Sequence, residues 1–236
     1  MRVYINFAYI NFVSLKPTLN QKMLKFVHPS TMIVSGPTGS GKSKFVSRVL
    51  LERMIEPAPE RIVWIYAEWQ PLYDILQAKL PSIEFIQGLP PNLYESISPR
   101  TRNVVVLDDQ MSEAGDSKEL SQLFTKGSHH RNLSLIYIAQ NMFDKGRSMR
   151  TVSLNAHYMV AFKSPRDKTQ ISYLGRQMFP SNSKFIVEAF DDATSEPYGY
   201  LVVDLRPETP EEYRVRTRIF DNESTIVYTS SGYKRK

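Results

Sequence analysis

Short apolar runs alternate along this chain with amphipathic segments of helical period. Apolar runs bounded by turn residues predict buried strands at 31–35, 61–66, 103–107, 133–139 and 157–162, with a shorter strand at 83–86. Helical spacing predicts helices from 44 to about 54 and at 72–79, 117–126 and 168–178. Buried strands that alternate with helices indicate an α/β fold, a mainly parallel sheet with helices on both faces.

The two ends of the chain depart from this alternation. Tyr198–Val203 and Arg214–Phe220 predict C-terminal antiparallel strands that add to the sheet. The first fifteen residues are apolar and aromatic, but Asn6 and Asn11 interrupt the run and no small-residue cleavage site follows, so a peripheral strand or loose arm is favoured over a secretory signal. We therefore expect an N-terminal arm at 1–22 and one domain at 23–236 that ends in a strand extension and a basic tail.

The first predicted strand, Thr31–Ser35, runs directly into a phosphate-binding motif. The motif G-x-x-x-x-G-K-[S/T] is matched at every fixed position by Gly36, Pro37, Thr38, Gly39, Ser40, Gly41, Lys42 and Ser43. Glycines let the backbone N–H groups face a phosphate, and the following helix adds the positive end of its dipole. Lys42 is expected to reach the β- and γ-phosphates, and the Ser43 hydroxyl to ligate Mg²⁺. This P-loop predicts that the chain binds a nucleoside triphosphate such as ATP.

The strand at 103–107 ends in two carboxylates, Asp108 and Asp109. At the carboxyl end of a strand that follows a P-loop, Asp108 is expected to serve Mg²⁺, and Asp109 to orient or deprotonate the attacking water. The other reading is a solvated acidic turn, since more acidic residues follow. Because the two carboxylates follow a complete P-loop in the chain, a role in nucleotide hydrolysis is favoured.

Two polar residues flank the strand at 133–139. Gln140 follows it, and would lie beside the P-loop and sense the γ-phosphate if this strand is inserted between the P-loop strand and the acidic strand. Arg131 precedes it, at the edge that faces away from the nucleotide of its own chain, so it could reach the nucleotide of a neighbour. Arg147, Arg150 and Arg166 compete for that role.

The charge is unevenly distributed. The chain has 30 Lys and Arg against 24 Asp and Glu, a net charge of +6. Between Lys126 and Arg176, nine basic residues stand against two acidic ones, and the chain ends in Lys234-Arg235-Lys236. A basic half suggests a polyanion such as nucleic acid, although a solvated basic face without a partner fits the charge equally well.

The composition argues against a disulfide-bonded protein, a thiolate metal protein and a membrane protein. Without cysteine there are no disulfides and no thiolate metal sites, which fits a reducing intracellular setting. No apolar stretch approaches the length of a membrane span, so no membrane association is expected.

Taken together, the P-loop, the acidic strand, Arg131 and the segment 133–140 resemble the FtsK–HerA superfamily of DNA-pumping ATPases. Further stretches, 127–132 with 137–141 and 153–158 with 162–167, are similar to the poxvirus-type genome-packaging ATPases, especially those of Polinton/Maverick-like viruses. The resemblance covers roughly 24–180, most of the chain. It implies a RecA-like, ASCE-type P-loop NTPase fold.

The resemblance further implies a homo-oligomeric ring that uses ATP and Mg²⁺ to move double-stranded DNA into a capsid, with a capsid protein or portal as partner, inside the host cell or associated with the virion. It assigns Gln140 as the sensor and Arg131 as the trans-acting arginine. Much of the superfamily carries Asp-Glu where this chain has Asp108-Asp109, which leaves Asp109 less secure as the base than Asp108 as the metal partner. Glu68, just after the strand at 61–66, could contribute to the site instead. The DNA contacts are expected at Lys145, Arg147 and Arg150, and they should grip phosphates rather than base edges.

Two other functions remain open from the residues alone. A small-molecule P-loop kinase would transfer phosphate to an acceptor, with an arginine-rich lid. A non-catalytic nucleotide switch, or a decayed copy of the gene, would bind nucleotide without turning it over. Hydrolysis that DNA stimulates in an oligomer would separate the motor from both.

Overall fold

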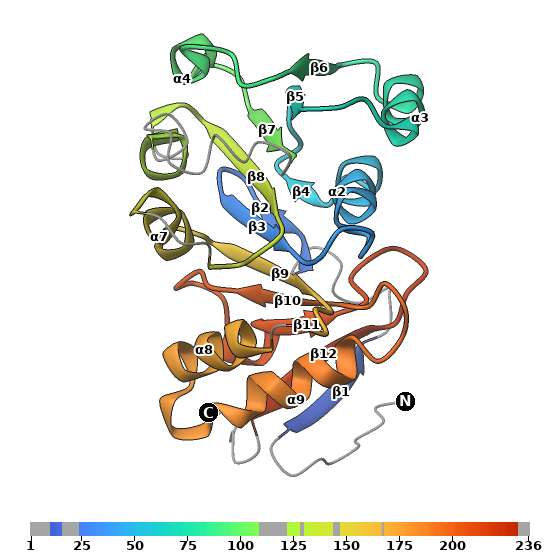
Figure 1. Cartoon of the computed structure of the whole chain (residues 1–236), viewed down its shortest axis with the longest axis vertical. Helices are drawn as coiled ribbons and strands as arrows, with labels where there is room; N and C mark the ends of the chain where they lie inside the picture. Colours follow the sequence, from blue (N-terminus) through green and yellow to red (C-terminus); the bar gives the residue numbers. More distant parts are fainter. Residues whose placement is uncertain are drawn as a thin grey trace. The chain divides into compact units, whose positions relative to one another are not determined.

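The computed structural model of the chain describes residues 10–15, 24–108, 122–127, 130–143, 147–166 and 168–230 (Figure 1). The chain divides into two compact units. The larger unit comprises Lys25–Tyr158, and the smaller unit comprises Met159–Lys236 with Met1–Leu24.

A parallel sheet forms the centre of the larger unit, in the order β3-β8-β7-β5-β6. Its strands are β3 (Thr31–Ser35), β5 (Arg61–Tyr66), β6 (Ile83–Gln87), β7 (Asn103–Leu107) and β8 (Leu133–Ala139). All residues of β3, β7 and β8 are buried, which is why these segments are mostly apolar and do not alternate between apolar and polar residues. The predicted α/β fold is confirmed, and so is the insertion of the strand at 133–139 between the P-loop strand and the acidic strand.

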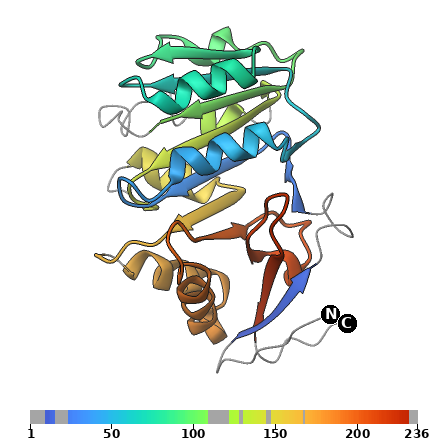
Figure 2. The same cartoon turned by 90° about the vertical axis from the view of Figure 1, so that its right-hand side faces the viewer.

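Helices cover both faces of this sheet (Figures 1 and 2). On one face lie α2 (Lys42–Leu51) and α3 (Pro71–Lys79), and on the other lie η2 (Leu123–Gly127) and α7 (Arg147–Leu154). The short helix α4 (Leu93–Ser96) lies between β6 and β7 in the chain. Of the helix predicted at 117–126, residues 117–121 lie outside the described residues, and the rest leads into η2.

The helix after the P-loop is shifted from its predicted bounds of Lys44 to about Met54. It begins at Lys42, immediately after Gly41, whose φ of 103° is left-handed and cannot continue a helix. It ends at Leu51 because the chain turns there, with Arg53 left-handed at φ 52°, into the short strand β4 (Ile55–Glu56). This strand pairs in parallel with β2 (Phe26–Val27).

The smaller unit contains antiparallel strands, as predicted for the C-terminal part. Its strands lie in the order β1-β12-β11-β10-β9. They are β1 (Ile10–Leu15), β12 (Thr225–Ser230), β11 (Val215–Thr217), β10 (Tyr200–Asp204) and β9 (Tyr158–Phe162), whose first residue belongs to the larger unit. Pairing is antiparallel between β10 and β11, β11 and β12, and β12 and β1. Part of the predicted N-terminal arm is thus an edge strand; residues 1–9 and 16–22 lie outside the described residues.

Two predicted C-terminal strands are shorter than expected. Tyr198–Val203 becomes β10 from Tyr200, and Arg214–Phe220 becomes β11. Tyr198 at φ 61° and Arg218 at φ 52° are both left-handed, a conformation outside the β region, so neither strand can include them.

Two helices pack together in the smaller unit: α8 (Thr169–Met178), close to its prediction, and α9 (Lys184–Ala193), which was not predicted. The 3₁₀ turns η3 (Pro180–Asn182) and η4 (Glu211–Tyr213) lie in its connections. Across the described ranges, no helix is long and apolar enough to cross a membrane.

Candidate nucleotide site

The P-loop connects the end of β3 to the first turn of α2. The Gly36 N–H donates to the Ala139 carbonyl at 3.2 Å, which ties the start of the loop to the end of β8. Gly39 at φ 79° and Gly41 at φ 103° take left-handed conformations that a side chain would strain. The glycines of the motif are therefore required by the path of the backbone.

Lys42 is the first residue of α2, and only 9% of its surface is exposed. Its ammonium donates to the Gly36 carbonyl at 2.6 Å and to the Pro37 carbonyl at 3.1 Å. A buried ammonium needs such acceptors. These contacts hold the charge of Lys42 against the loop, where the motif places the phosphates.

A hydrogen bond joins Ser43 of α2 to Asp108, which follows β7. The Ser43 hydroxyl donates to Asp108 Oδ2 at 3.3 Å, although the residues are 65 positions apart. Asp108 is 6% exposed, and its N–H donates to the Ile65 carbonyl at 2.9 Å, which fixes the backbone at the end of β7. A hydroxyl and a carboxylate are hard oxygen ligands of the kind that Mg²⁺ prefers, so this pair fits the predicted metal site.

Tyr73 of α3 is a third member of this site. Its hydroxyl donates to Asp108 Oδ2 at 2.8 Å, and the residue is fully buried. Burial and the neighbouring charge of Asp108 raise the pKa of Tyr73, so the phenol stays protonated. Sequence reasoning missed this residue because no motif surrounds it; the only signal was its place in a helix that follows the neighbouring strand.

Of the other residues predicted for the site, the structure describes Gln140 and Glu68. Gln140 follows β8 directly and is exposed, beside the loop that Ala139 contacts. Asp109 lies outside the described residues. Glu68, its proposed substitute, is exposed in the turn after β5.

Arg131 lies at the opposite edge of the sheet, before the amino end of β8, and the P-loop follows the carboxyl end of β3. Its guanidinium carbon is 4.7 Å from the centre of the Tyr94 ring, and Nη1 donates to the Ile97 carbonyl at 3.4 Å. The strands are parallel, so Arg131 cannot approach the P-loop of its own chain.

The residues predicted to contact DNA are only partly described. Lys145 lies outside the described residues. Arg147 and Arg150 belong to α7, but the placement of their side chains is likewise outside what the structure describes.

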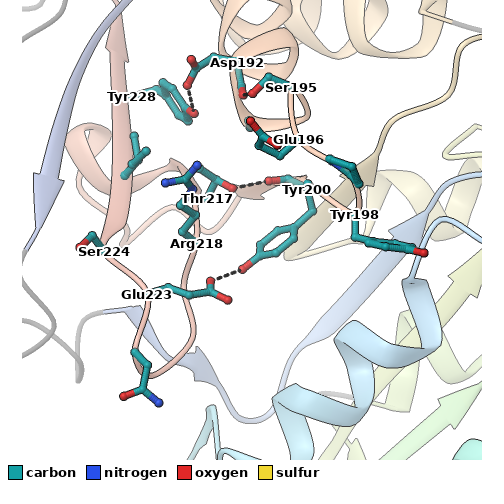
Figure 3. A pocket seen from close by; sticks show the side chains of 15 residues that line it. Asp192, Ser195, Glu196, Tyr198, Tyr200, Thr217, Arg218, Glu223, Ser224 and Tyr228 are labelled. Atoms are coloured by element: carbon teal, nitrogen blue, oxygen red, sulfur yellow. Dashed lines mark hydrogen bonds between the residues drawn. The ribbon is translucent and has the colours of Figure 1, made fainter.

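A polar cavity of about 520 Å³ lies in the smaller unit, and its lining includes none of these residues (Figure 3). Two tyrosine hydroxyls on its walls donate to carboxylates: Tyr228 to Asp192 at 2.6 Å and Tyr200 to Glu223 at 3.3 Å. Burial, followed by the hydrogen bond to Asp192, raises the pKa of Tyr228. The cavity contains no part of the phosphate-binding motif.

Comparisons with known proteins show which proteins the chain resembles. No family model matches the chain. Over 131 residues the chain is 23% identical to Packaging protein 1 of Snake adenovirus serotype 1, a match that spans 42% of this chain and only 30% of the adenovirus protein. Among solved structures, the genome packaging NTPase B204 from Sulfolobus turreted icosahedral virus 2, in complex with ATP-gammaS, aligns with a TM-score of 0.52. That alignment covers 80% of this chain and 95% of the other, at 13% identity.

A second structure is that of B204, the DNA-packaging ATPase from Sulfolobus Turreted Icosahedral Virus. It aligns with a TM-score of 0.51 over 75% of this chain and 92% of the other, at 12% identity. At such low identity these two alignments show the fold. The chain therefore has the fold of a P-loop NTPase, and the predicted resemblance to viral genome-packaging ATPases is confirmed at that level.

Proposed function

We propose that this protein is the ATPase of a viral DNA-packaging motor, which hydrolyses ATP to move double-stranded DNA into a capsid. The observation that carries the proposal is the contact between Ser43 and Asp108. The strand order β3-β8-β7 brings Ser43 and Asp108, the proposed halves of the site, to one edge of the sheet, and this supports the proposal. The likeness to packaging proteins supports the choice of DNA as cargo.

ATP is the proposed nucleotide, held by the loop from Gly36 to Ser43. The backbone N–H groups of the loop and the first turn of α2 would receive the phosphates, and Lys42 would neutralise charge on the β- and γ-phosphates. Moving its ammonium from the loop carbonyls to the phosphates replaces neutral acceptors by charged ones, which strengthens its hydrogen bonds.

Mg²⁺ would be held by Ser43 and Asp108. When bound, it would neutralise the negative charge that develops on the phosphates during transfer. Asp109 would orient or deprotonate the water, and Gln140 would contact the γ-phosphate at the end of β8. The side chain of Asp109 is one methylene shorter than that of the glutamate found in much of the superfamily. To act on the attacking water, Asp109 would therefore need a bridging water or a position closer to the nucleotide.

A homo-oligomeric ring would complete the site. Arg131 lies at the edge of the sheet opposite its own P-loop, and a neighbouring subunit could present that edge to the nucleotide. Tyr94 and the Ile97 carbonyl hold the guanidinium in a defined place. An arginine supplied in trans stabilises the charge of the transition state.

The DNA would be bound through its phosphates. The basic segment from Lys126 to Arg176 and the basic tail supply the positive charge, and a motor that moves along any sequence needs no base contacts. A capsid protein or portal would anchor the ring, in the host cell or on the virion.

ATP hydrolysis by the purified protein, with and without long duplex DNA, tests the proposal. We expect DNA to raise the rate, and Lys42→Ala to lower it roughly 10²–10³-fold, because the variant lacks the charge on the phosphates. Lys44→Ala, an exposed lysine two positions further along α2, is the matched control and should keep the rate.

Three results would contradict the motor. Phosphate transfer to a small acceptor without DNA would favour a kinase. Nucleotide binding without any turnover would favour a switch. A folded protein that neither binds nor hydrolyses ATP would remove the nucleotide site altogether.

A further inference from the structure

Tyr73 lies at the start of α3 in the middle of an aromatic cluster. Its ring centre is 5.1 Å from that of Phe85, 5.4 Å from that of Tyr66, and 5.5 Å from those of Trp64 and Trp69. Such distances are typical of favourable ring packing. The cluster fixes the direction of the Tyr73 side chain, since the residue is fully buried among rigid neighbours.

The hydroxyl of this rigid side chain ends on Asp108. It donates to Oδ2 at 2.8 Å, and the same oxygen accepts the Ser43 hydroxyl at 3.3 Å. One carboxylate oxygen thereby joins the P-loop helix, helix α3 and the acidic strand. The aromatic packing alone would need only the ring of Tyr73, so the hydroxyl requires a separate explanation.

A phenol carries one O–H group, which can donate a hydrogen bond. The packed ring holds that donor in one place, 2.8 Å from Asp108 Oδ2.

We propose that Tyr73 is a positioning residue for Asp108, which orients the carboxylate toward the Mg²⁺ of the bound nucleotide. This inference rests on the proposed nucleotide and metal site. Hydrogen bonds to a ligating carboxylate fix its orientation, and their loss typically weakens metal binding or activity by roughly 10–100-fold. Ser43 can donate its proton to Asp108 while a lone pair of the hydroxyl serves the metal, so Tyr73 and Ser43 together determine where the carboxylate points.

The variant Tyr73→Phe isolates the hydroxyl, because it keeps the ring in the cluster. The measurement is the affinity for a fluorescent, non-hydrolysable ATP analogue, once with Mg²⁺ and once with EDTA. We expect Mg²⁺ to tighten binding to the wild-type protein, and Tyr73→Phe to reduce that tightening roughly ten-fold. The affinity in EDTA should stay unchanged, since Tyr73 contacts the carboxylate and not the phosphate loop.

Tyr66→Phe is the matched control. Tyr66 belongs to the same aromatic cluster, and within the described part of the chain its hydroxyl makes no hydrogen bond. Its loss should leave the effect of Mg²⁺ as in the wild type. Asp108→Asn provides a second test, because the effect of Tyr73→Phe on Mg²⁺-dependent binding should largely disappear in that background.

The outcomes separate this inference from the proposed function. If the wild-type protein binds no nucleotide, both fail. If Mg²⁺ tightens binding equally in the wild type and in Tyr73→Phe, only the positioning role fails. A lower melting temperature of Tyr73→Phe with an unchanged effect of Mg²⁺ would also overturn it, since that result defines a role in stability alone.

Discussion

Several polar side chains that the larger unit buries are held by specific partners. Lys42 donates to loop carbonyls, Asp108 accepts from two hydroxyls, and His28 contacts two side chains near the start of β8. Burying a polar or charged group without such partners is costly. Residues of this kind are therefore sensitive both to substitution and to protonation.

His28 gives a prediction on pH. It is 5% exposed, with Nδ1 2.7 Å from Ser134 Oγ and Nε2 3.0 Å from Asn132 Oδ1. Burial lowers its pKa below the ordinary value of 6.5; the hydrogen bond to Asn132 and the charge of Glu60 oppose this, and the charge of Arg102 adds to it. As pH falls below 6.5, the unfolded chain takes up a proton that the folded chain resists, so the free energy of unfolding decreases. The loss is at most about 1.4 kcal/mol per pH unit, down to the lowered pKa.

Urea unfolding at pH 7.5 and 5.5 measures this effect. The decrease should be smaller in His28→Gln, which has no imidazole to protonate, and unchanged in His130→Gln, whose side chain is exposed. An equal decrease in the wild type and His28→Gln would show that other groups cause it.

Among the elements, the strands of the larger unit were predicted best. The bounds of β3, β5, β7 and β8 agree with the sequence pattern, because strands buried on both faces are mostly apolar. Gly36, Asp108 and Gln140 follow the ends of β3, β7 and β8. Helix α9 was missed, although Phe185, Ile186, Ala189 and Phe190 repeat with helical spacing and are buried. What the pattern did not show was the packing of α9 against its neighbour.

The close contact between α8 and the turn before α9 predicts how a substitution at Gly175 changes stability. Gly175 of α8 lies so close to the turn before α9 that an added Cβ would come within 2.5 Å of the Ser183 carbonyl oxygen. Alanine normally favours a helix over glycine by about 1 kcal/mol, but here the clash is with backbone that cannot rotate away. We expect Gly175→Ala to destabilise the protein by about 1–3 kcal/mol.

The free energy of unfolding in urea checks this expectation. Gln177→Ala, at an exposed position of the same helix, should change it by less than about 0.5 kcal/mol. Stabilisation by Gly175→Ala would show that the two helices can separate at no cost.

For the whole molecule, the decisive feature is the position of Arg131 relative to the direction of the strands. The P-loop lies at their carboxyl ends, and Arg131 lies at their amino ends. A single chain thus has the phosphate site on one edge and the proposed arginine on the other. Such an arrangement suits head-to-tail assembly, in which each subunit completes the site of its neighbour.

If Arg131 acts on the nucleotide of a neighbouring subunit, the variant Arg131→Ala should bind ATP normally but hydrolyse it roughly 10³–10⁵-fold more slowly. Arg100→Ala, an exposed arginine in the turn before β7, should retain the rate. Mixing Arg131→Ala with Lys42→Ala subunits should restore part of the activity, because an intact P-loop then meets an intact arginine. A normal rate in monomeric Arg131→Ala would exclude a role in trans.

The P-loop, the acidic end of the strand at 103–107 and the α/β class could be predicted from the order of the amino acids, because spacing and apolar periodicity are local properties of the chain. Three relations could be seen only in three dimensions: the Ser43 hydroxyl donates to Asp108, Tyr73 donates to the same oxygen, and Arg131 lies at the edge of the sheet opposite its own P-loop. These contacts join residues on different elements. They depend on strand order and on the packing of α3, which no short stretch of sequence encodes.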